Sequence, residues 1–297
     1  MYKKKSAVLF LISSLICVFT FTWVPFIYSF CLSLKVGRGN NLHYAGIQNY
    51  VRLFSDDTFI KSLENTLFFA LVIAPLVLLI SFALACLINN IKSQKWKSVV
   101  CTMVYLPSIT STIAYSYFFK NFFATDGFLN GFLRLLHFTD ESYNYLLTPY
   151  GARIAVILLC LWAWTGYYTI FILSGLQNID RSMYESAIID GANSFQTLRY
   201  ITIPAISPVL LFVSVLIFGA MFQMITEIMI LTKGGPAEST LTLAYYAYRL
   251  SFEYAPQFGY ATTVSVVILI LSIASTFILF FIFKGIFGLE YEHVENR

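Results

Sequence analysis

Apolar residues run along this chain in six long stretches that are separated by polar segments. The stretches cover residues 7–34, 65–91, 98–119, 154–176, 203–231 and 261–287. A helix of about 20 consecutive apolar residues is long enough to cross a bilayer. The pattern therefore predicts an all-α polytopic membrane protein, with six spanning helices in a single transmembrane domain over residues 1–297.

Composition supports this class. Hydrophobic residues make up 58% of the chain and charged residues only 11%, whereas a soluble domain carries about 25% charged residues. The first stretch follows three lysines, as in a signal peptide. It is much longer than the apolar core of a signal peptide, about 7–15 residues, and no small-residue cleavage site follows it. We therefore expect a retained first span.

The distribution of Lys and Arg predicts the orientation. An even number of spans places both termini on one side, and positive charge favours the cytoplasmic side. With the termini inside, the cytoplasmic segments hold Lys3, Lys4, Lys5, Lys92, Lys95, Lys97, Arg181, Arg199, Lys284 and Arg297. The bias is strongest at the N-terminus and in the turn at residues 91–97, so both termini are expected in the cytoplasm.

Candidate chemistry is sparse. The five cysteines have neither metal-ligand nor disulfide spacing: Cys17, Cys31, Cys86, Cys101 and Cys160. The histidines, His43, His137 and His293, match no zinc-hydrolase motif, and the chain contains no phosphate-binding G-x-x-x-x-G-K-[ST] motif. We therefore expect no catalytic residue, no metal site, no cofactor and no ATPase activity in this chain.

The segment between the fourth and fifth stretches is predicted to form a helical elbow. Ser182 and Glu185 have capping-box spacing, which indicates that a short helix starts there. Gly191 suits the left-handed residue that ends such a helix. Ser194 is expected to cap a second short helix, and Pro204 fits the first turn of the fifth span.

The first helix of this elbow carries an apolar stripe. Tyr184, Ala187 and Ile188 recur at i, i+3 and i+4, which places them on one face. An apolar stripe outside the membrane requires a partner, either the ends of the helix bundle or another protein.

The elbow resembles the EAA motif of ABC importer permeases, which reads E-A-A, three residues, G, nine residues, I-x-L-P. Here the matching residues are Glu185-Ser186-Ala187, Gly191 and Ile201-x-Ile203-Pro204, with Ser186 and Ile203 as mild departures. In that family the loop is a coupling helix that docks on the cytoplasmic ATPase subunit. The resemblance therefore implies a coupling helix at about 181–200, with Glu185, Ala187 and Gly191 as coupling residues.

Two further segments resemble the carbohydrate-uptake branch of the same family. One follows the fifth stretch, Leu231-Thr232-Lys233-Gly234-Gly235-Pro236, with Ser239, Thr240, Leu243, Tyr246, Phe252 and Gly259 after it. The other is Gly46-Ile47-Gln48-Asn49-Tyr50-x-x-Leu53-Phe54, followed by Asn65-Thr66. Together they are similar to permeases for oligosaccharides and glycerol-3-phosphate, over nearly the whole chain.

The resemblance implies a type I ABC importer permease fold in the bacterial inner membrane. It also implies a second, related permease, two cytoplasmic ATPase subunits and an extracytoplasmic sugar-binding protein. An oligosaccharide is the expected cargo. Glycerol-3-phosphate or another polyol is the alternative within the family, and the sequence does not identify the sugar.

Candidate pathway residues lie in the fourth and fifth stretches. Trp164 and Tyr167 supply aromatic faces beside a glycine, on a helix where the family places substrate contacts, although such rings more often serve packing or interface anchoring. Glu227 is an acid within an apolar run, so it faces a cavity or partner, or the span ends early and Glu227 lies among the headgroups. Gln223 shares its helix face.

Two alternatives of other classes remain at this point. A stand-alone secondary transporter or channel is expected to carry paired intramembrane charges or inverted repeats, and the sequence shows one such acid and no repeat. A membrane-embedded enzyme lacks a recognisable catalytic motif here. Co-purification with an ATPase separates all three classes.

Overall fold

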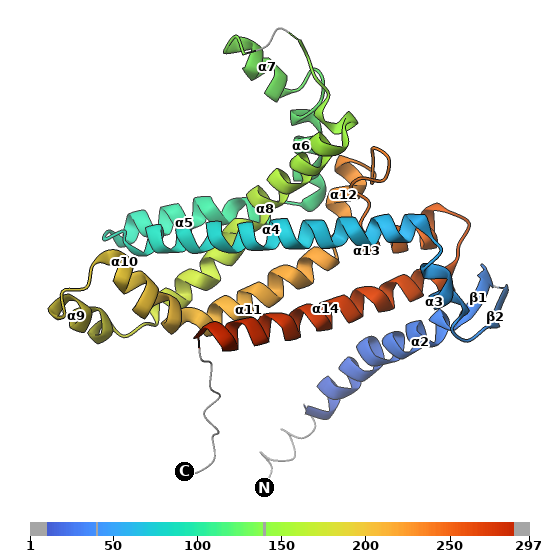
Figure 1. Cartoon of the computed structure of the whole chain (residues 1–297), viewed down its shortest axis with the longest axis horizontal. Coiled ribbons are helices and arrows are strands. Elements are labelled where there is room, and N and C mark those ends of the chain that lie inside the picture. Colours follow the sequence, from blue (N-terminus) through green and yellow to red (C-terminus); the bar gives the residue numbers. More distant parts are fainter. Residues whose placement is uncertain (1–10, 40, 139–140, 288–297) are drawn as a thin grey trace. The chain divides into compact units, whose positions relative to one another are not determined.

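The structure is a computed structural model that describes residues 11–39, 41–138 and 141–287 (Figure 1). The Lys3–Lys5 cluster, residues 7–10 of the first expected span, His293 and Arg297 lie outside the described residues. Helices dominate the described ranges, and their strands are β1 (Lys35–Arg38) and β2 (Asn41–Tyr44), an antiparallel pair. Lys35 pairs with Tyr44 and Val36 with His43 in this ribbon.

Five described helices are long and apolar enough to cross a membrane. They are Leu11–Ser33, α4 (Asp57–Asn89), α8 (Pro149–Gln177), the continuous helix Ser194–Phe222 and α14 (Phe258–Phe287). The first contains a π-turn, η1 (Phe19–Trp23), followed by α2 (Val24–Ser33). A sixth span arises if α5 (Gln94–Ile109) and α6 (Thr112–Phe122) are counted as one bent pair. The expected all-α polytopic architecture is therefore confirmed.

Two of the six expected ranges are interrupted. Within residues 98–119, α6 leaves α5 at an angle of 88° (Figure 1). Within residues 203–231, α11 (Ile203–Phe222) ends before the short α12 (Thr226–Leu231). The carbonyl of Met224, freed at this second break, accepts a hydrogen bond of 2.8 Å from Thr242 Oγ1. Breaks in membrane helices are tolerated where such partners exist.

The remaining short elements connect these helices. They are α3 (Gln48–Leu53), α7 (Phe128–Leu135), η2 (Tyr145–Leu147), α9 (Arg181–Ile189), α10 (Ser194–Thr197), η3 (Leu198–Thr202), α13 (Leu243–Tyr248) and η4 (Arg249–Glu253). By its internal contacts the chain forms two compact units. The first is Met1–Ile60 with Tyr246–Leu269, and the second is Lys61–Tyr245 with Ile270–Arg297.

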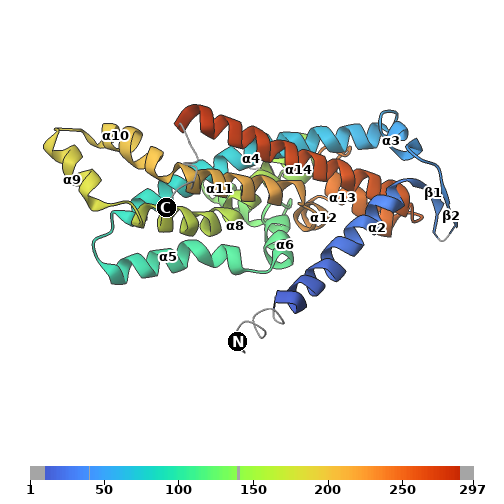
Figure 2. The ribbon, with the colours of Figure 1, turned by 90° about the horizontal axis from the view of Figure 1, so that it is seen from below.

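The second unit is built around α8. One side of α8 is fully buried along its length, with Ala152, Ala155, Val156, Leu159, Cys160 and Ile172 at 0% exposure. Helices α5 and α11 pack against α8, and α12 packs against α6. The α9–α10 segment lies beyond one end of α8 and α11 (Figure 2).

Polar side chains hold the loop that precedes α13. Asn65 Nδ2 donates to the carbonyls of Glu238 and Leu241, at 2.6 and 3.1 Å. Arg153 donates from Nε to the Ser239 carbonyl and from Nη2 to Asn65 Oδ1, both at 3.0 Å. Because buried backbone carbonyls are costly without donors, these two side chains fix the loop relative to α4 and α8.

The first unit is organised around Asp56. Its Oδ2 accepts hydrogen bonds of 2.6 Å from both Tyr246 and Tyr260, and its Oδ1 accepts from the amides of Thr58 and Phe59 at the start of α4. Burial raises the pKa of Asp56, but these hydrogen bonds outweigh it and hold the pKa below the ordinary value of 3.8. One carboxylate thus caps α4 and gathers two tyrosines from the opposite end of the sequence.

We expect Asp56→Asn to destabilise the first unit by about 1 kcal/mol, because it weakens hydrogen bonds to a charged acceptor. A group with a lowered folded-state pKa contributes stability above its unfolded pKa and loses that contribution as pH falls through the folded pKa. The difference in unfolding free energy between wild type and Asp56→Asn should therefore stay constant from about pH 7 to pH 5. It should disappear only below pH 3.8. Thermal unfolding and hydrogen exchange of residues 246–260 measure it.

Asp57→Asn is the matched control, because Asp57 is the exposed next residue on the chain. Equal losses of stability in the two variants would contradict the role of Asp56. So would a stability difference between wild type and Asp56→Asn that grows as the pH falls.

Candidate functional sites: the α9–α10 elbow and the Glu227 cavity

The elbow begins with an aspartate cap. Asp180 is the N-cap of α9, and its Oδ1 accepts from the Ser182 amide at 2.9 Å. The backbone and side chain of Ser182 both donate to this exposed carboxylate, and together they lower the pKa of Asp180. The expected cap at Ser182 is therefore wrong by two residues, because the aspartate before it supplies the acceptor.

Gly191 ends α9 as predicted from the sequence. Its φ is +73°, a left-handed conformation in which a Cβ is strained. The Ala192 amide donates to the Ala187 carbonyl at 2.9 Å, and the Gly191 amide donates to the Ile188 carbonyl at 3.1 Å. This pair of bonds is a Schellman motif, which satisfies the last carbonyls of a helix.

The second helix of the elbow starts at once. Asn193 Oδ1 accepts from the Gln196 amide at 2.9 Å, and Gln196 Oε1 accepts from the Asn193 amide at 2.8 Å. This reciprocal pair is a complete capping box, so Asn193 is the cap of α10. The sequence had indicated Ser194 for this role. The elbow therefore closes both helix ends with its own hydrogen bonds.

The three residues assigned by the EAA resemblance face different ways. Ala187 is buried at 5% exposure, whereas Glu185 and Gly191 are exposed. The predicted apolar stripe is also divided: Tyr184 Oη lies 3.2 Å from Thr202 Oγ1, but Ile188 is 74% exposed. One face of α9 thus meets the bundle and the other is open.

Large apolar side chains continue this open face. They are Ile188, Ile189, Phe195 and Tyr200, exposed by 74%, 85%, 71% and 72%. Several exposed large apolar residues on one short segment are typical of a protein-binding surface.

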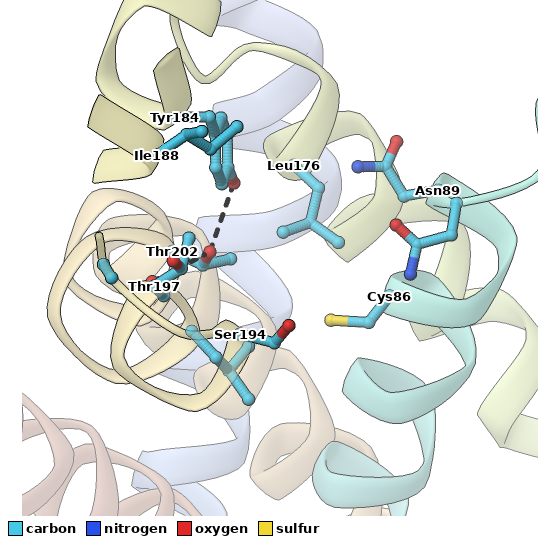
Figure 3. A pocket seen from close by; sticks show the side chains of 11 residues that line it. Cys86, Asn89, Leu176, Tyr184, Ile188, Ser194, Thr197 and Thr202 are labelled. Carbon is cyan, nitrogen blue, oxygen red and sulfur yellow. Dashed lines mark hydrogen bonds between the residues drawn. The ribbon is translucent and has the colours of Figure 1, made fainter. Parts of the chain in front are cut away.

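A hollow of about 490 Å³ lies beneath the elbow (Figure 3). The end of α4 contributes Cys86 and Asn89, α8 contributes Leu176, and the elbow contributes Tyr184 and Ile188. No periodicity or motif in the sequence indicated it. The elbow therefore does not pack tightly onto α4.

The second candidate site is the Glu227 cavity, and it depends on close packing of α5 against α8. Gly166 of α8 lies against the Val104 carbonyl of α5, where an added Cβ would clash. Four residues further along α5, Ser108 Oγ donates to the Ala163 carbonyl at 2.8 Å and accepts from the Tyr167 amide at 3.0 Å. Ala163 and Tyr167 are one helical turn apart, so the Ser108 hydroxyl joins two groups of the α8 backbone.

Glu227 is buried beside this contact. Its side chain on α12 is 7% exposed and accepts from Tyr115 Oη at 3.0 Å. The Trp164 side chain is a second hydrogen-bond partner of the same carboxylate. Glu227 thus faces a cavity, and it also lies beyond the end of the long helix Ser194–Phe222, so its placement along the pathway stays a prediction.

The cavity has a volume of about 280 Å³. It is lined by Ser108, Thr110, Thr112, Tyr115, Ala163, Trp164, Tyr167, Tyr168, Ala220 and Glu227. Three of the four candidate pathway residues, Trp164, Tyr167 and Glu227, thus meet in one cavity. Gln223 does not line it, because its side chain is exposed and its Nε2 donates to the Gly219 carbonyl at 3.1 Å.

Tyr115 and Ser108 are two of the lining residues that sequence reasoning missed. Both flank the bend between α5 and α6, and only Pro107 marked that position in the sequence. The cavity is surrounded by hydroxyl groups, aromatic faces and one carboxylate. These groups provide hydrogen-bond partners and stacking surfaces, which suit a polyhydroxylated ligand.

We expect Gly166→Val to push α5 away from α8, because the new side chain meets backbone that cannot move aside. Overpacking of this kind costs about 1–3 kcal/mol and also displaces Ser108 from the α8 backbone. The thermal unfolding temperature and transport activity of the purified, reconstituted protein should both fall. Gly219→Val is the matched control, since open space surrounds Gly219; equal effects of the two substitutions would argue against the close contact.

Comparison with known proteins identifies the family of the chain. Residues 3–287 match the family described as "binding-protein-dependent transport system inner membrane component". The lactose transport system permease protein LacF of Rhizobium radiobacter is 38% identical over 275 residues, 92% of each chain. The arabinooligosaccharides transport system permease protein AraP of Bacillus subtilis (strain 168) is 29% identical over 277 residues, 91% of this chain and 86% of that protein.

A solved structure shows the same fold. One chain of a bacterial ABC transporter involved in the import of the acidic polysaccharide alginate superposes with a TM-score of 0.82 and 23% identity, over 96% of this chain and 97% of that chain. The expected type I importer permease fold is therefore confirmed. The family is a transport component of the membrane and not an enzyme, and its systems depend on a binding protein. This chain belongs to the family of binding-protein-dependent transport system inner membrane components, the permease subunits of ABC importers.

Proposed function

We propose that this permease takes up a sugar, an oligosaccharide in particular, as one half of a translocation pathway. Relatives whose names specify lactose and arabinooligosaccharides support the cargo class. The observation that carries the proposal is the cavity in which Trp164, Tyr167 and Glu227 converge. The other half of the pathway is supplied by a second, related permease, and an extracytoplasmic sugar-binding protein delivers the cargo.

Two ATPase subunits complete the assembly. The elbow of each permease is the docking element for one of them. Its exposed Glu185 offers a carboxylate to a basic residue, and its exposed Ile188, Ile189 and Phe195 offer apolar surface. Ala187 and the Tyr184–Thr202 contact join the elbow to the bundle. The hollow beneath it leaves room for the elbow to shift against α4 when the ATPase moves.

The Glu227 cavity lies where a shift of the elbow can open it. It is bordered by the bend between α5 and α6 and by the break between α11 and α12. Segments with few helical hydrogen bonds change conformation at lower cost than continuous helices. ATP-driven displacement of α9 and α10 therefore acts, through α8 and α11, on the walls of the sugar site and gives alternating access.

The partners of Glu227 favour transport of this kind over secondary transport. Its hydrogen-bond donors are the neutral Tyr115 and Trp164. Ion-coupled carriers instead pair intramembrane charges with one another, and ATP hydrolysis by a separate subunit removes the need for such a pair.

Both termini and the turn between α4 and α5 lie in the cytoplasm in this proposal. Cysteine labelling tests it in a background without the five native cysteines. Lys95→Cys should be protected from an impermeant thiol reagent added outside, and Asp57→Cys should be labelled, since both positions are exposed in the structure. Labelling at 95 with protection at 57 would reverse the orientation and remove the elbow from the ATPase side.

Coupling is tested at Gly191. A residue with a Cβ costs roughly 1–2 kcal/mol in the left-handed region, which is small for the folded bundle but large enough to displace a docking helix. Gly191→Val should therefore leave membrane insertion intact, weaken co-purification with the ATPase subunit and lower sugar-stimulated ATP hydrolysis severalfold. Glu185→Lys should have the same effect through charge reversal.

Gly46→Val provides the matched control, because Gly46 has a φ of +58° and open space around it, and it belongs to the first compact unit whereas the elbow belongs to the second. It carries the same backbone cost without touching the elbow. Wild-type stimulation in both elbow variants, or equal loss in Gly46→Val, would show that the elbow is not the coupling element.

A further inference from the structure

We propose that the Glu227 cavity admits neutral sugar units and discriminates against sugars that carry a carboxylate or a phosphate. This inference rests on the proposed function and names the substrate class of the same site. It follows from the charges and hydrogen-bonding groups that face the cavity.

The lining residues carry one charged group. Glu227 is the acid, and no Lys, Arg or His is among the residues that line the cavity. Two bases on helices that border the cavity are engaged elsewhere. Arg153 lies eleven residues before Trp164 on α8, roughly 16 Å along a helix axis, and donates to the Ser239 carbonyl and Asn65. Lys120 of α6 lies over the ring of Tyr117, 5.8 Å from its centroid.

Glu227 retains capacity to bind hydroxyl groups. An ionised carboxylate has about four acceptor positions. Three are used, by Tyr115, by Trp164 and by the backbone amide of Glu227 itself, and these partners hold the carboxylate in place. The remaining position suits a hydroxyl of a sugar ring, a charge-assisted interaction that is about twice as strong as a neutral hydrogen bond.

The other walls match the rest of a sugar ring. The side chains of Trp164 and Tyr167 present aromatic surface to the cavity, against which the C–H face of a pyranose can stack. Thr112 adds a hydroxyl that can donate and accept. The hydroxyls of Ser108 and Thr110 already donate to backbone carbonyls, those of Ala163 and Leu106, and therefore add acceptor positions. A volume of about 280 Å³ is at the lower limit for ligand pockets, so one unit of an oligosaccharide occupies this half of the pathway.

An anionic sugar meets repulsion at the same place. Two negative charges about 5 Å apart in a partly buried site repel by an amount that corresponds to at least tenfold in affinity. No lining cation offsets this repulsion. This chain shares its fold with a chain of an alginate transporter, but its cavity does not suit an acidic cargo. The glycerol-3-phosphate alternative is disfavoured for the same reason.

The experiment measures sugar binding to the transporter itself, without the binding protein, so that the binding protein's own selectivity does not enter. The complex of both permeases with hydrolysis-deficient ATPase subunits is placed in lipid nanodiscs with ATP. The probes are radiolabelled lactose, maltose and cellobiose, each beside the same disaccharide with one primary alcohol oxidised to a carboxylate. Equilibrium dialysis gives each Kd.

In the wild type, the preferred neutral disaccharide should bind at least tenfold more tightly than its acidic counterpart. Glu227→Gln should reduce this ratio about tenfold, because it removes the charge and keeps the shape. Tyr115→Phe keeps the carboxylate, so the ratio should persist. Glu64→Gln is the charge-matched control, since Glu64 is an exposed acid on α4 and should leave both affinities unchanged.

Three outcomes count against the inference. Equal binding of neutral and acidic sugars by the wild type overturns it while leaving sugar uptake standing. An unchanged ratio in Glu227→Gln, with the complex intact, shows that another group sets the selectivity and also overturns it. If no disaccharide of either kind binds, the proposed function fails, and the inference fails with it.

Discussion

Backbone amides and carbonyls inside a bilayer must find hydrogen-bond partners within the protein, and this requirement governs the shape of the second unit. A continuous helix meets it without help, but the two interrupted ranges do not. At the break after α11, Thr242 supplies the donor for the Met224 carbonyl. At the bend after α5, Ser108 bonds to the backbone of α8. The break after α11 therefore depends on a side chain from another segment, and the end of α5 is tied to α8 beside its bend.

These same dependencies create the cavity. Ser108 brings the end of α5 to Trp164 and Tyr167, and the break after Phe222 turns Glu227 inward to meet Tyr115. A site made at helix breaks is polar where a site between straight helices would be apolar. The chain thus obtains a hydrophilic surface within its membrane-spanning part without inserting a row of charged residues, which would be costly there.

The sequence predicted the class, the helical architecture and the elbow more fully than the cavity. Hydrophobic runs located the spans, because burial in lipid leaves a signal in every residue of the helix. Proline did not locate the bends: Pro75 and Pro208 lie inside uninterrupted helices, whereas Pro107 precedes an 88° change of direction. The outcome depends on which donors lie nearby in space, and Ser108 and Thr242 are recognisable only once the helices are packed.

The caps of the elbow show a finer limit. Ser182 and Ser194 were reasonable caps, but Asp180 and Asn193 take those roles. Ser, Asp and Asn cap helices with similar strength, so a sequence that places two of them within two residues does not decide between them. Gly191 was predicted correctly because a left-handed position strongly favours one residue type.

The hydrogen bonds that shape the elbow join residues within a few positions of one another in the sequence. Such a segment carries its own geometry from one protein scaffold to another. Under the proposed function, the choice of ATPase and the choice of sugar are then inherited through separate parts of the chain. A permease of this kind can change its cargo during evolution while it keeps its motor, and several importers in one cell can share a single ATPase.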